Sequence, residues 1–427
     1  FYFSTFEVDP KDPKRVYRPG FLFAYSEDGG YSFSEASYEG GGLHPDMHAL
    51  WIHPNNPDIL YVGTDGGIYR SIDKGITWIF NQNLPVGQFY HVAHDLEKPY
   101  HVYGGLQDNG SWMAPTAAPG GISNARWDRL NGGDGFWTIP DVDGQTVYAE
   151  YQGGHMSRVN KLTMKSEDIQ PKQTQQDEDL RWNWNTPIVT GKEKKKNLYT
   201  GSQYLYKSTN QGRDWTRISG DLTTNNKDKQ KQEESGGLSA DNTSAENHCT
   251  IFTIAESPLD ANMVWVGTDD GNLQYTNDGG KTWKNVSANY AQSGIPSATW
   301  ISSIEPSHFD KNILYATVDN HMYGDHRTFL GKSTDMGATW TRIQHNEFTG
   351  FAHKICEDPI NKNLLFLGTE MGLFATLDGG KHWFRMKNNI PEYAMVRDIK
   401  IHPVTHDLIV GTHGRGIFIV DDITAMR

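Results

Sequence analysis

The chain has little of what disulfide scaffolds, membrane proteins and nucleic-acid-binding proteins depend on. Its 427 residues include two cysteines, Cys249 and Cys356, which are too few for a disulfide framework and fit no metal-binding spacing. No apolar run reaches the roughly 20 residues that a membrane-spanning helix needs. Acidic residues outnumber basic ones by 52 to 39, for a formal net charge of −13. A nucleic-acid partner is therefore not expected, because such a protein carries a basic face.

A signal peptide is also missing, and residues 1–10 read as the inner strand of a repeat that is already under way. We therefore expect the chain to be part of a longer polypeptide or of a larger assembly. Under that interpretation the missing signal is no argument for a cytoplasmic location.

What the chain does have suits many short strands joined by tight turns. Hydrophobic residues make up 36% of it, which is ample for a core, and it contains 44 Gly, 13 Trp and 20 Tyr. Such a mixture is typical of closed all-β architectures, which often exceed the average domain in length.

The pattern Ser/Thr-x-Asp-x-Gly-x-Thr-Trp, an Asp box, recurs along the chain. Full and looser copies lie at residues 26–33, 71–78, 208–215, 276–283, 333–340 and 376–383. From Trp340 to Trp383 is 43 residues, a period typical of propeller blades, and the longer interval from Trp215 to Trp283 is one such unit plus a polar insertion. The interval from Trp78 to Trp215 spans about three such periods, which predicts two further repeats without a recognisable box.

Each repeat has the same order of short alternating strands and Gly- or Pro-containing turns, as in residues 50–71. The sequence therefore predicts an all-β fold: a β-propeller of four-stranded antiparallel blades with Asp-box hairpins. Seven or eight blades fit the length, with room for part of a second propeller. The last repeat, residues 398–422, shows three strands and no box.

The Asp boxes themselves are interpreted as structural. The glycine can adopt the positive φ of a tight turn, and the carboxylate can accept hydrogen bonds from turn amides. The same aspartate recurs in blades that cannot all be active, so we assign a structural role to Asp28, Asp73, Asp278, Asp335 and Asp378.

Domain boundaries follow from the repeats. Residues 1–40 are expected to be the last blade of a preceding propeller or the first blade of this one, and residues 41–427 the propeller itself. Polar insertions are expected near residues 160–183 and 221–246, where the strand pattern is interrupted.

Several further segments carry a resemblance to a known family. They lie at residues 44–51, 104–112, 132–136, 184–187, 244–250 and 411–416. With them the chain resembles the Asp-box (bacterial neuraminidase repeat, BNR) propellers, and among these the sortilin-like secreted bacterial proteins often labelled glycosyl hydrolases.

The resemblance implies a large extracytoplasmic protein (secreted, periplasmic or on the cell surface) with two tandem propellers, as in xyloglucan-hydrolysing glycosidases. It implies no single activity, because members of the superfamily hydrolyse sugars or simply bind partners. The family's catalytic aspartates, one in each propeller, match no motif in this chain and are not carried over.

In a propeller the innermost strands line a central channel, so functional side chains should cluster just before or within the first strand of each repeat. The residues predicted to bind a ligand there are His44, His48, His91, Trp184, His248, Trp300 and Arg397.

His44, Asp46 and His48 form the sharpest local pattern. In an extended strand their side chains would share one face, about 7 Å apart. Two imidazoles and a carboxylate are a plausible set of ligands for a divalent cation. Hydrogen bonding to neighbouring loops and acid–base chemistry on a sugar are the alternatives, and no other cofactor is expected.

Two functions remain open. One is a secreted or cell-surface recognition propeller that binds a protein or a glycan on its channel-mouth face. The other is a glycoside hydrolase acting on a polysaccharide in a cleft between tandem propellers. Hydrolysis needs two carboxyl groups around the scissile bond, and the candidates are Asp46, Asp134 and Glu246.

Overall fold

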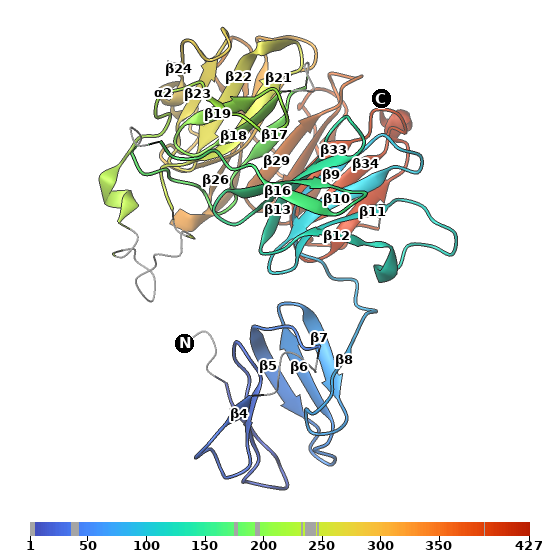
Figure 1. The fold of residues 1–427 in the computed structure, drawn as a ribbon. Helices are drawn as coiled ribbons and strands as arrows, with labels where there is room; N and C mark the ends of the chain where they lie inside the picture. Colours follow the sequence, from blue (N-terminus) through green and yellow to red (C-terminus); the bar gives the residue numbers. More distant parts are fainter. Residues whose placement is uncertain are drawn as a thin grey trace. The chain divides into compact units, whose positions relative to one another are not determined.

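The computed structural model describes residues 5–35, 42–174, 178–192, 197–231, 234, 245, 247–387 and 389–427. Their regular secondary structure is almost entirely short antiparallel strands, which form nine sheets and are drawn as arrows in Figure 1. The prediction of an all-β propeller with four-stranded antiparallel blades is confirmed. The chain divides into two compact units, Phe1–Pro85 and Val86–Arg427.

The unit Phe1–Pro85 contains two four-stranded sheets. The first is formed by β1 (Glu7–Val8), β2 (Val16–Arg18), β3 (Ala24–Ser26) and β4 (Ser34–Glu35). The second is formed by β5 (Met47–Ile52), β6 (Leu60–Thr64), β7 (Gly67–Ser71) and β8 (Ile79–Phe80). The compact unit ends at residue 85 and not at residue 40, and the assignment of residues 1–40 to a preceding propeller or a first blade stays a prediction.

The unit Val86–Arg427 contains seven sheets, numbered here as blades 1 to 7. Blade 1 is β9 (Phe89–His94), β10 (His101–Leu106), β11 (Gly110–Pro115) and β12 (Asp128–Asn131). Blade 2 is β13 (Gly135–Pro140), β14 (Thr146–Tyr151), β15 (His155–Asn160) and β16 (Lys165–Asp168). Blade 3 is β17 (Ile188–Thr190), β18 (Leu198–Gly201), β19 (Leu205–Ser208) and β20 (Thr216–Arg217). Blade 4 is β21 (Ile251–Ser257), β22 (Asp260–Thr268), β23 (Leu273–Thr276) and β24 (Lys284–Asn285).

The remaining blades follow in the same order. Blade 5 is β25 (Trp300–Pro306), β26 (Leu314–Asn320), β27 (Asp325–Ser333) and β28 (Thr341–Ile343). Blade 6 is β29 (Ala352–Glu357), β30 (Leu365–Thr369), β31 (Gly372–Thr376) and β32 (Phe384–Arg385). Blade 7 is β33 (Val396–Ile401), β34 (Leu408–Thr412) and β35 (Gly416–Val420). Short helices lie in the connections: η1 (Asn124–Arg126), η2 (Lys227–Gln230), α2 (Ser287–Ala291), η4 (His321–Tyr323) and η5 (Ile423–Met426).

The seven blades close into a ring. Neighbouring blades pack through their first strands, and β33 of blade 7 packs against β9 of blade 1 (Figure 1). Across this junction Val92 and Ile409 share a buried apolar cluster with Tyr100 and Val102. The unit is thus a seven-bladed propeller, and within the described residues its last blade has the three strands that the sequence predicted.

The repeat spacing predicted two blades without an Asp box and two polar insertions. The two repeats predicted between Trp78 and Trp215 without an Asp box are blades 1 and 2. The expected insertion at residues 160–183 includes β16, the outer strand of blade 2, which pairs with β15. The other expected insertion, residues 221–246, contains η2, and much of it lies outside the described residues.

The carboxylate of each Asp box is used within its own turn. In the box at residues 71–78, Asp73 accepts hydrogen bonds from the Ser71 hydroxyl at 2.8 Å and from the Thr77 hydroxyl at 2.6 Å. Gly75 has a φ of 85°, and a β-carbon there would lie 3.0 Å from Phe23. Two hydroxyl groups bond the carboxylate in the same way at Asp28, Asp278 and Asp335. At Asp378 the partners are the Thr376 hydroxyl and the His382 imidazole.

Candidate channel-mouth site

Six of the seven innermost strands of the ring carry a β-bulge near their beginning, within the described residues. A bulge turns a side chain out of the regular alternation and is common next to functional sites. We call the face of the ring where the innermost strands begin the channel mouth. The bulges contain Tyr90 and His91, Phe136 and Trp137, Phe252, Ser302, His353 and Arg397.

His91 contacts side chains from three other blades at the channel mouth. Its ring stacks on Trp137 of blade 2, with centroids 3.6 Å apart. Its Nε2 lies 3.2 Å from Oδ1 of Asn185, which precedes β17 of blade 3. Its Nδ1 lies 3.6 Å from a carboxylate oxygen of Asp398 in blade 7. These contacts from three other blades place the imidazole toward the centre of the ring.

One carboxylate, Asp398, and two cations, Arg397 and Lys400, act on His91. The Lys400 ammonium lies 3.0 Å from the buried Asp398 carboxylate and 5.9 Å from the Trp137 ring centre. Burial lowers the pKa of His91 to about 4, although Asp398 opposes the shift. Burial acts to raise the pKa of Asp398, but Lys400 and His91 outweigh it and the pKa is lowered. At neutral pH the pair is therefore a neutral imidazole beside an ionised carboxylate.

Asp134, a catalytic candidate, and Trp184, a binding candidate, lie in contact. The Trp184 Nε1 donates to Oδ2 of Asp134 at 3.0 Å, and the backbone N–H of Asp108 donates to its Oδ1 at 2.9 Å. A close approach of two backbones positions this carboxylate, because a β-carbon on Gly105 would lie 2.2 Å from the carbonyl carbon of Gly135. Only 7% of Asp134 is exposed.

A second carboxylate, Asp269, is buried beneath the channel mouth. It is not one of the catalytic candidates proposed from the sequence. It accepts hydrogen bonds from the hydroxyl of Thr250 at 2.6 Å and from the side-chain amide of Asn183 at 3.4 Å. The Asn183 side chain in turn accepts from the backbone N–H of Asn185, the partner of His91. Burial, followed by the neighbouring Asp270, raises the pKa of Asp269 to about 7. Asp269 is fully buried.

His248 and Trp300, both predicted to bind a ligand, belong to an aromatic group on blades 4 and 5. Their rings meet edge to face at 5.4 Å, and Trp300 lies 6.3 Å from the ring of Tyr323. Tyr323 is 54% exposed, and its hydroxyl accepts a hydrogen bond from Lys229 at 2.7 Å. We call Trp300 and Tyr323 the aromatic rim, since they offer ring faces at the channel mouth.

Arg397, the last of the predicted binding residues in this unit, faces the start of blade 1. Its guanidinium lies 5.1 Å from the ring centre of Tyr90. Burial, with Arg397 next in effect, lowers the pKa of the neighbouring His353 well below its usual value. Both groups are bulge residues, so the bulges of blades 6 and 7 add one cation and one neutral imidazole to the channel mouth at neutral pH.

His44, Asp46 and His48 lie in the unit Phe1–Pro85, where His48 is the bulge residue of β5. The Nε2 of His48 lies 2.8 Å from a carboxylate oxygen of Asp65, and Nδ1 of His44 lies 3.0 Å from the carbonyl oxygen of Pro45. The ligand atoms of the three residues do not lie within 4.8 Å of one another. The divalent cation at this position stays a prediction that the geometry does not support.

Across the described residues, one group of three acidic or imidazole side chains meets that 4.8 Å limit: Asp95, Glu97 and His101. Lys161 occupies its centre, with the ammonium 2.6 Å from Glu97 and 3.3 Å from Asp95. The group follows the end of β9 and is therefore on the face opposite the channel mouth. Because the lysine supplies the positive charge, the arrangement is an internal ion cluster.

The structure thus brings two pairs of predicted residues of the ring into contact, Asp134 with Trp184 and His248 with Trp300. It places His91 against Asn185, the residue that follows Trp184. Glu246 lies outside the described residues. Sequence reasoning missed Asp398, Lys400 and Asp269. The position of Asp398 directly after a bulge required strand register, and Asp269 lies in a Thr-Asp-Asp-Gly turn that reads as an ordinary hairpin.

Comparisons with known proteins find similarity in one repeat of the chain and in a stretch of 148 residues. A family model described as BNR/Asp-box repeat matches residues 274–285, in blade 4. The chain carries a BNR/Asp-box repeat. It is 32% identical over 148 residues to a xyloglucanase of Hypocrea jecorina, a match that covers 31% of this chain and 16% of that protein.

Two solved structures are similar over nearly the whole chain. One is the GH74 enzyme of Niastella koreensis, at 15% identity and a TM-score of 0.32, covering 97% of this chain and 76% of the enzyme. The other is the GH74 xyloglucanase of Xanthomonas campestris, at 14% identity and a TM-score of 0.31, covering 98% and 72%. Among the described residues, no helix is both long enough and apolar enough to cross a membrane.

Proposed function

We propose that this chain is a carbohydrate-active propeller of the glycoside hydrolase type, which holds a polysaccharide at the channel mouth of the unit Val86–Arg427. The observation that carries the proposal is the 32% identity over 148 residues to a xyloglucanase. A neutral, xyloglucan-like glucan is the corresponding substrate class. Such a polymer does not cross membranes, so the protein would act outside the cytoplasm.

The aromatic rim supports the binding part of this proposal. Sugar rings present apolar C–H faces that pack on aromatic side chains, and an aromatic contact adds roughly 0.5–1.5 kcal/mol beyond area burial. Tyr323 is 54% exposed, and Trp300 contributes a second ring 6.3 Å away. Polar groups of the neighbouring channel, such as Arg397 and Asn185, could orient hydroxyl groups.

Hydrolysis needs one carboxyl group that is protonated and one that is ionised. Asp134 is the candidate among the described residues of this unit; Asp46 lies in the unit Phe1–Pro85, and Glu246 lies outside the described residues. Asp269 has the raised pKa that suits a proton donor. However, its fully buried side chain cannot reach a substrate in this conformation.

The burial of Asp269 and the hydrogen bonds that hold Asp134 favour a second candidate function. In it the propeller recognises a glycan, or a protein, without cleaving it. The two candidates share the aromatic rim and differ only in whether new reducing ends appear.

Two measurements test the proposal. The purified chain is incubated with xyloglucan and a panel of other polysaccharides, and new reducing ends are measured. Calorimetry measures the binding of xyloglucan oligosaccharides. Tyr323→Ala should weaken binding by about three- to tenfold, the loss expected for one aromatic contact. Phe309→Ala is the matched control, since Phe309 is an exposed ring on the opposite face. Asp134→Asn should reduce any release of reducing ends by about 100-fold or more.

The outcomes separate the candidates. Binding without reducing ends would leave the recognition function and overturn hydrolysis. Equal losses in Tyr323→Ala and Phe309→Ala would place the ligand elsewhere. Neither binding nor cleavage of any polysaccharide in the panel would overturn both functions for carbohydrates.

A further inference from the structure

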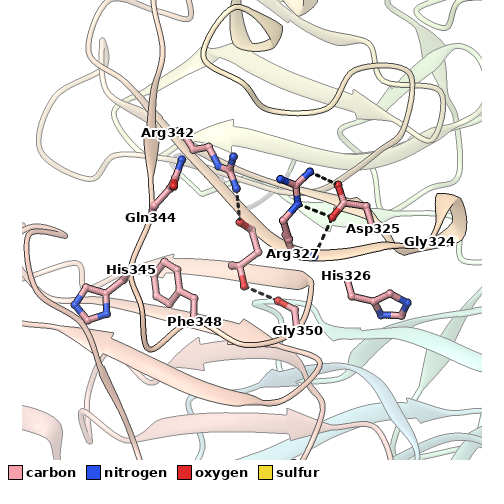
Figure 2. Close-up of a pocket in the computed structure, with 10 residues that line it drawn as sticks. Gly324, Asp325, His326, Arg327, Arg342, Gln344, His345, Phe348 and Gly350 are labelled. Carbon is pink, nitrogen blue, oxygen red and sulfur yellow. Dashed lines mark hydrogen bonds and ion pairs between the residues drawn. The ribbon is translucent and has the colours of Figure 1, made fainter.

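A separate pocket of about 580 Å³ lies on blade 5, between the beginning of β27, the end of β28 and the loop that leads to β29 (Figure 2). Pockets of roughly 300–1,000 Å³ are typical of sites for small ligands. The turn before β27 and the loop before β29 both lie at the channel mouth. Its lining residues are Gly324, Asp325, His326, Arg327, Thr328, Arg342, Gln344, His345, Phe348 and Gly350.

The pocket contains two arginines, although the whole chain has a formal net charge of −13. Two histidines also line it; Nδ1 of His326 lies 3.5 Å from the carboxylate of Glu370, and Asp325 is the one carboxylate among the lining residues. That carboxylate is already paired, because Arg327 donates to its two oxygens at 2.8 Å and 2.7 Å. The second arginine of the lining, Arg342, has no carboxylate partner among the described residues.

Arg342 is held in place without an anion. Its guanidinium lies over the ring of Phe329 at 4.4 Å and donates to the carbonyl oxygens of Gly294 and Thr328 at 3.3 Å and 3.4 Å. Across the part of the chain that the structure describes, no carboxylate oxygen lies within 4.0 Å of it. Burial, and then the nearby Arg327, lowers the pKa of Arg342, because both add a cost to its positive charge. A bound anion would relieve that cost.

The opposite wall of the pocket is apolar and fixed. Phe348 packs edge to face on Phe374 at 5.5 Å and on Trp383 at 5.2 Å. Its ring therefore has a defined position beside the polar side chains of Gln344 and His345 (Figure 2). A ligand that fits has an anionic group for the guanidinium, an apolar ring face for Phe348 and hydroxyl groups for the polar side chains.

We propose that this pocket binds the carboxylate-bearing unit of an acidic saccharide, a uronic acid residue, with its carboxylate at Arg342 and its ring against Phe348. Guanidinium groups match carboxylates in shape and form strong charge-assisted hydrogen bonds with them. The saccharide class rests on the function proposed above, whereas the preference for a negative charge rests on the pocket alone.

The test is calorimetric titration of the whole chain with trigalacturonate at low salt, with cellotriose as the neutral probe. Trigalacturonate should bind, and Arg342→Gln should weaken its affinity by about tenfold or more, the usual loss for a hydrogen bond to a charged group. Gln344→Glu adds a carboxylate to an exposed position of the pocket and should also weaken binding, by about fivefold. Gln145→Glu, an exposed glutamine on the opposite face, is the matched control and should change nothing.

Because Gln344 is exposed, its variant keeps the test valid even where Arg342→Gln fails to fold. The proposal is overturned if trigalacturonate does not bind, if Gln344→Glu binds it as well as the parent, or if sodium sulfate competes equally well, which would mark a site for bare anions. Retained binding of neutral xyloglucan oligosaccharides in such a case would leave the proposed function standing. Loss of neutral binding alone would overturn that function and not the pocket.

Discussion

At the scale of single residues, His91 shows how burial sets the chemistry of the channel. Its ring lies between Trp137 and Asn185, and 16% of the side chain is exposed. The imidazole is uncharged at pH 7 because the protein around it solvates a cation poorly. It therefore lies between Asn185 and Asp398 without adding a positive charge beside Lys400.

Acidification should destabilise the propeller through His91. The folded-state pKa of about 4 lies below the usual value of 6.5, so the unfolded chain takes up the proton first as the pH falls. The free energy of unfolding should fall between about pH 6.5 and pH 4, by up to about 3 kcal/mol for this residue. His91→Gln should make that fall smaller, which denaturant unfolding at pH 7 and pH 5 can measure. An NMR titration in which the His91 ring protonates near pH 6.5 would contradict the account.

At the scale of an element, the Asp box of blade 3 has its side-chain pair reversed. In the box of blade 4 the Thr282 hydroxyl donates to the Asp278 carboxylate at 2.6 Å. In blade 3 the acidic residue comes second: the side-chain amide of Asn210 donates to the Asp214 carboxylate at 2.7 Å. The turn geometry therefore needs one donor and one acceptor at the two positions and accepts them in either order.

Asn210→Asp alone should destabilise this turn, although it restores the common motif. The new carboxylate would face the Asp214 carboxylate where the Asn210 amide now donates a 2.7 Å hydrogen bond. Because two carboxylates repel each other there, we expect the free energy of unfolding to fall by about 1–2 kcal/mol. Adding Asp214→Thr should recover most of the loss. A double-mutant cycle from denaturant unfolding measures the coupling, and purely additive effects would count against the donor–acceptor interpretation.

At the scale of the whole molecule, the repeat made the architecture predictable. The Asp boxes and their spacing predicted the blades, including two without a box, because each blade repeats one local hydrogen-bonding pattern. The closing contact between β33 and β9 joins strands from opposite ends of the unit, and no local pattern encodes it.

The site was less predictable for a related reason. Sequence pointed to the first strands, and His91, Asp134, Trp184 and Trp300 do lie at the channel mouth. The bulge that orients His91 depends on strand register, which a single residue shifts. Arg342 could not be singled out from sequence, because its role rests on the absence of a carboxylate neighbour in three dimensions.

The proposed function requires a polysaccharide to bind at the channel mouth of the unit Val86–Arg427. Hydrogen exchange of the chain, measured with and without a saturating xyloglucan oligosaccharide, reports on that binding. We predict slower exchange at residues 300–302 and 321–327, around the aromatic rim, and unchanged exchange at residues 95–101 on the opposite face. Protection confined to the opposite face, or no protection anywhere at saturation, would contradict the proposed function.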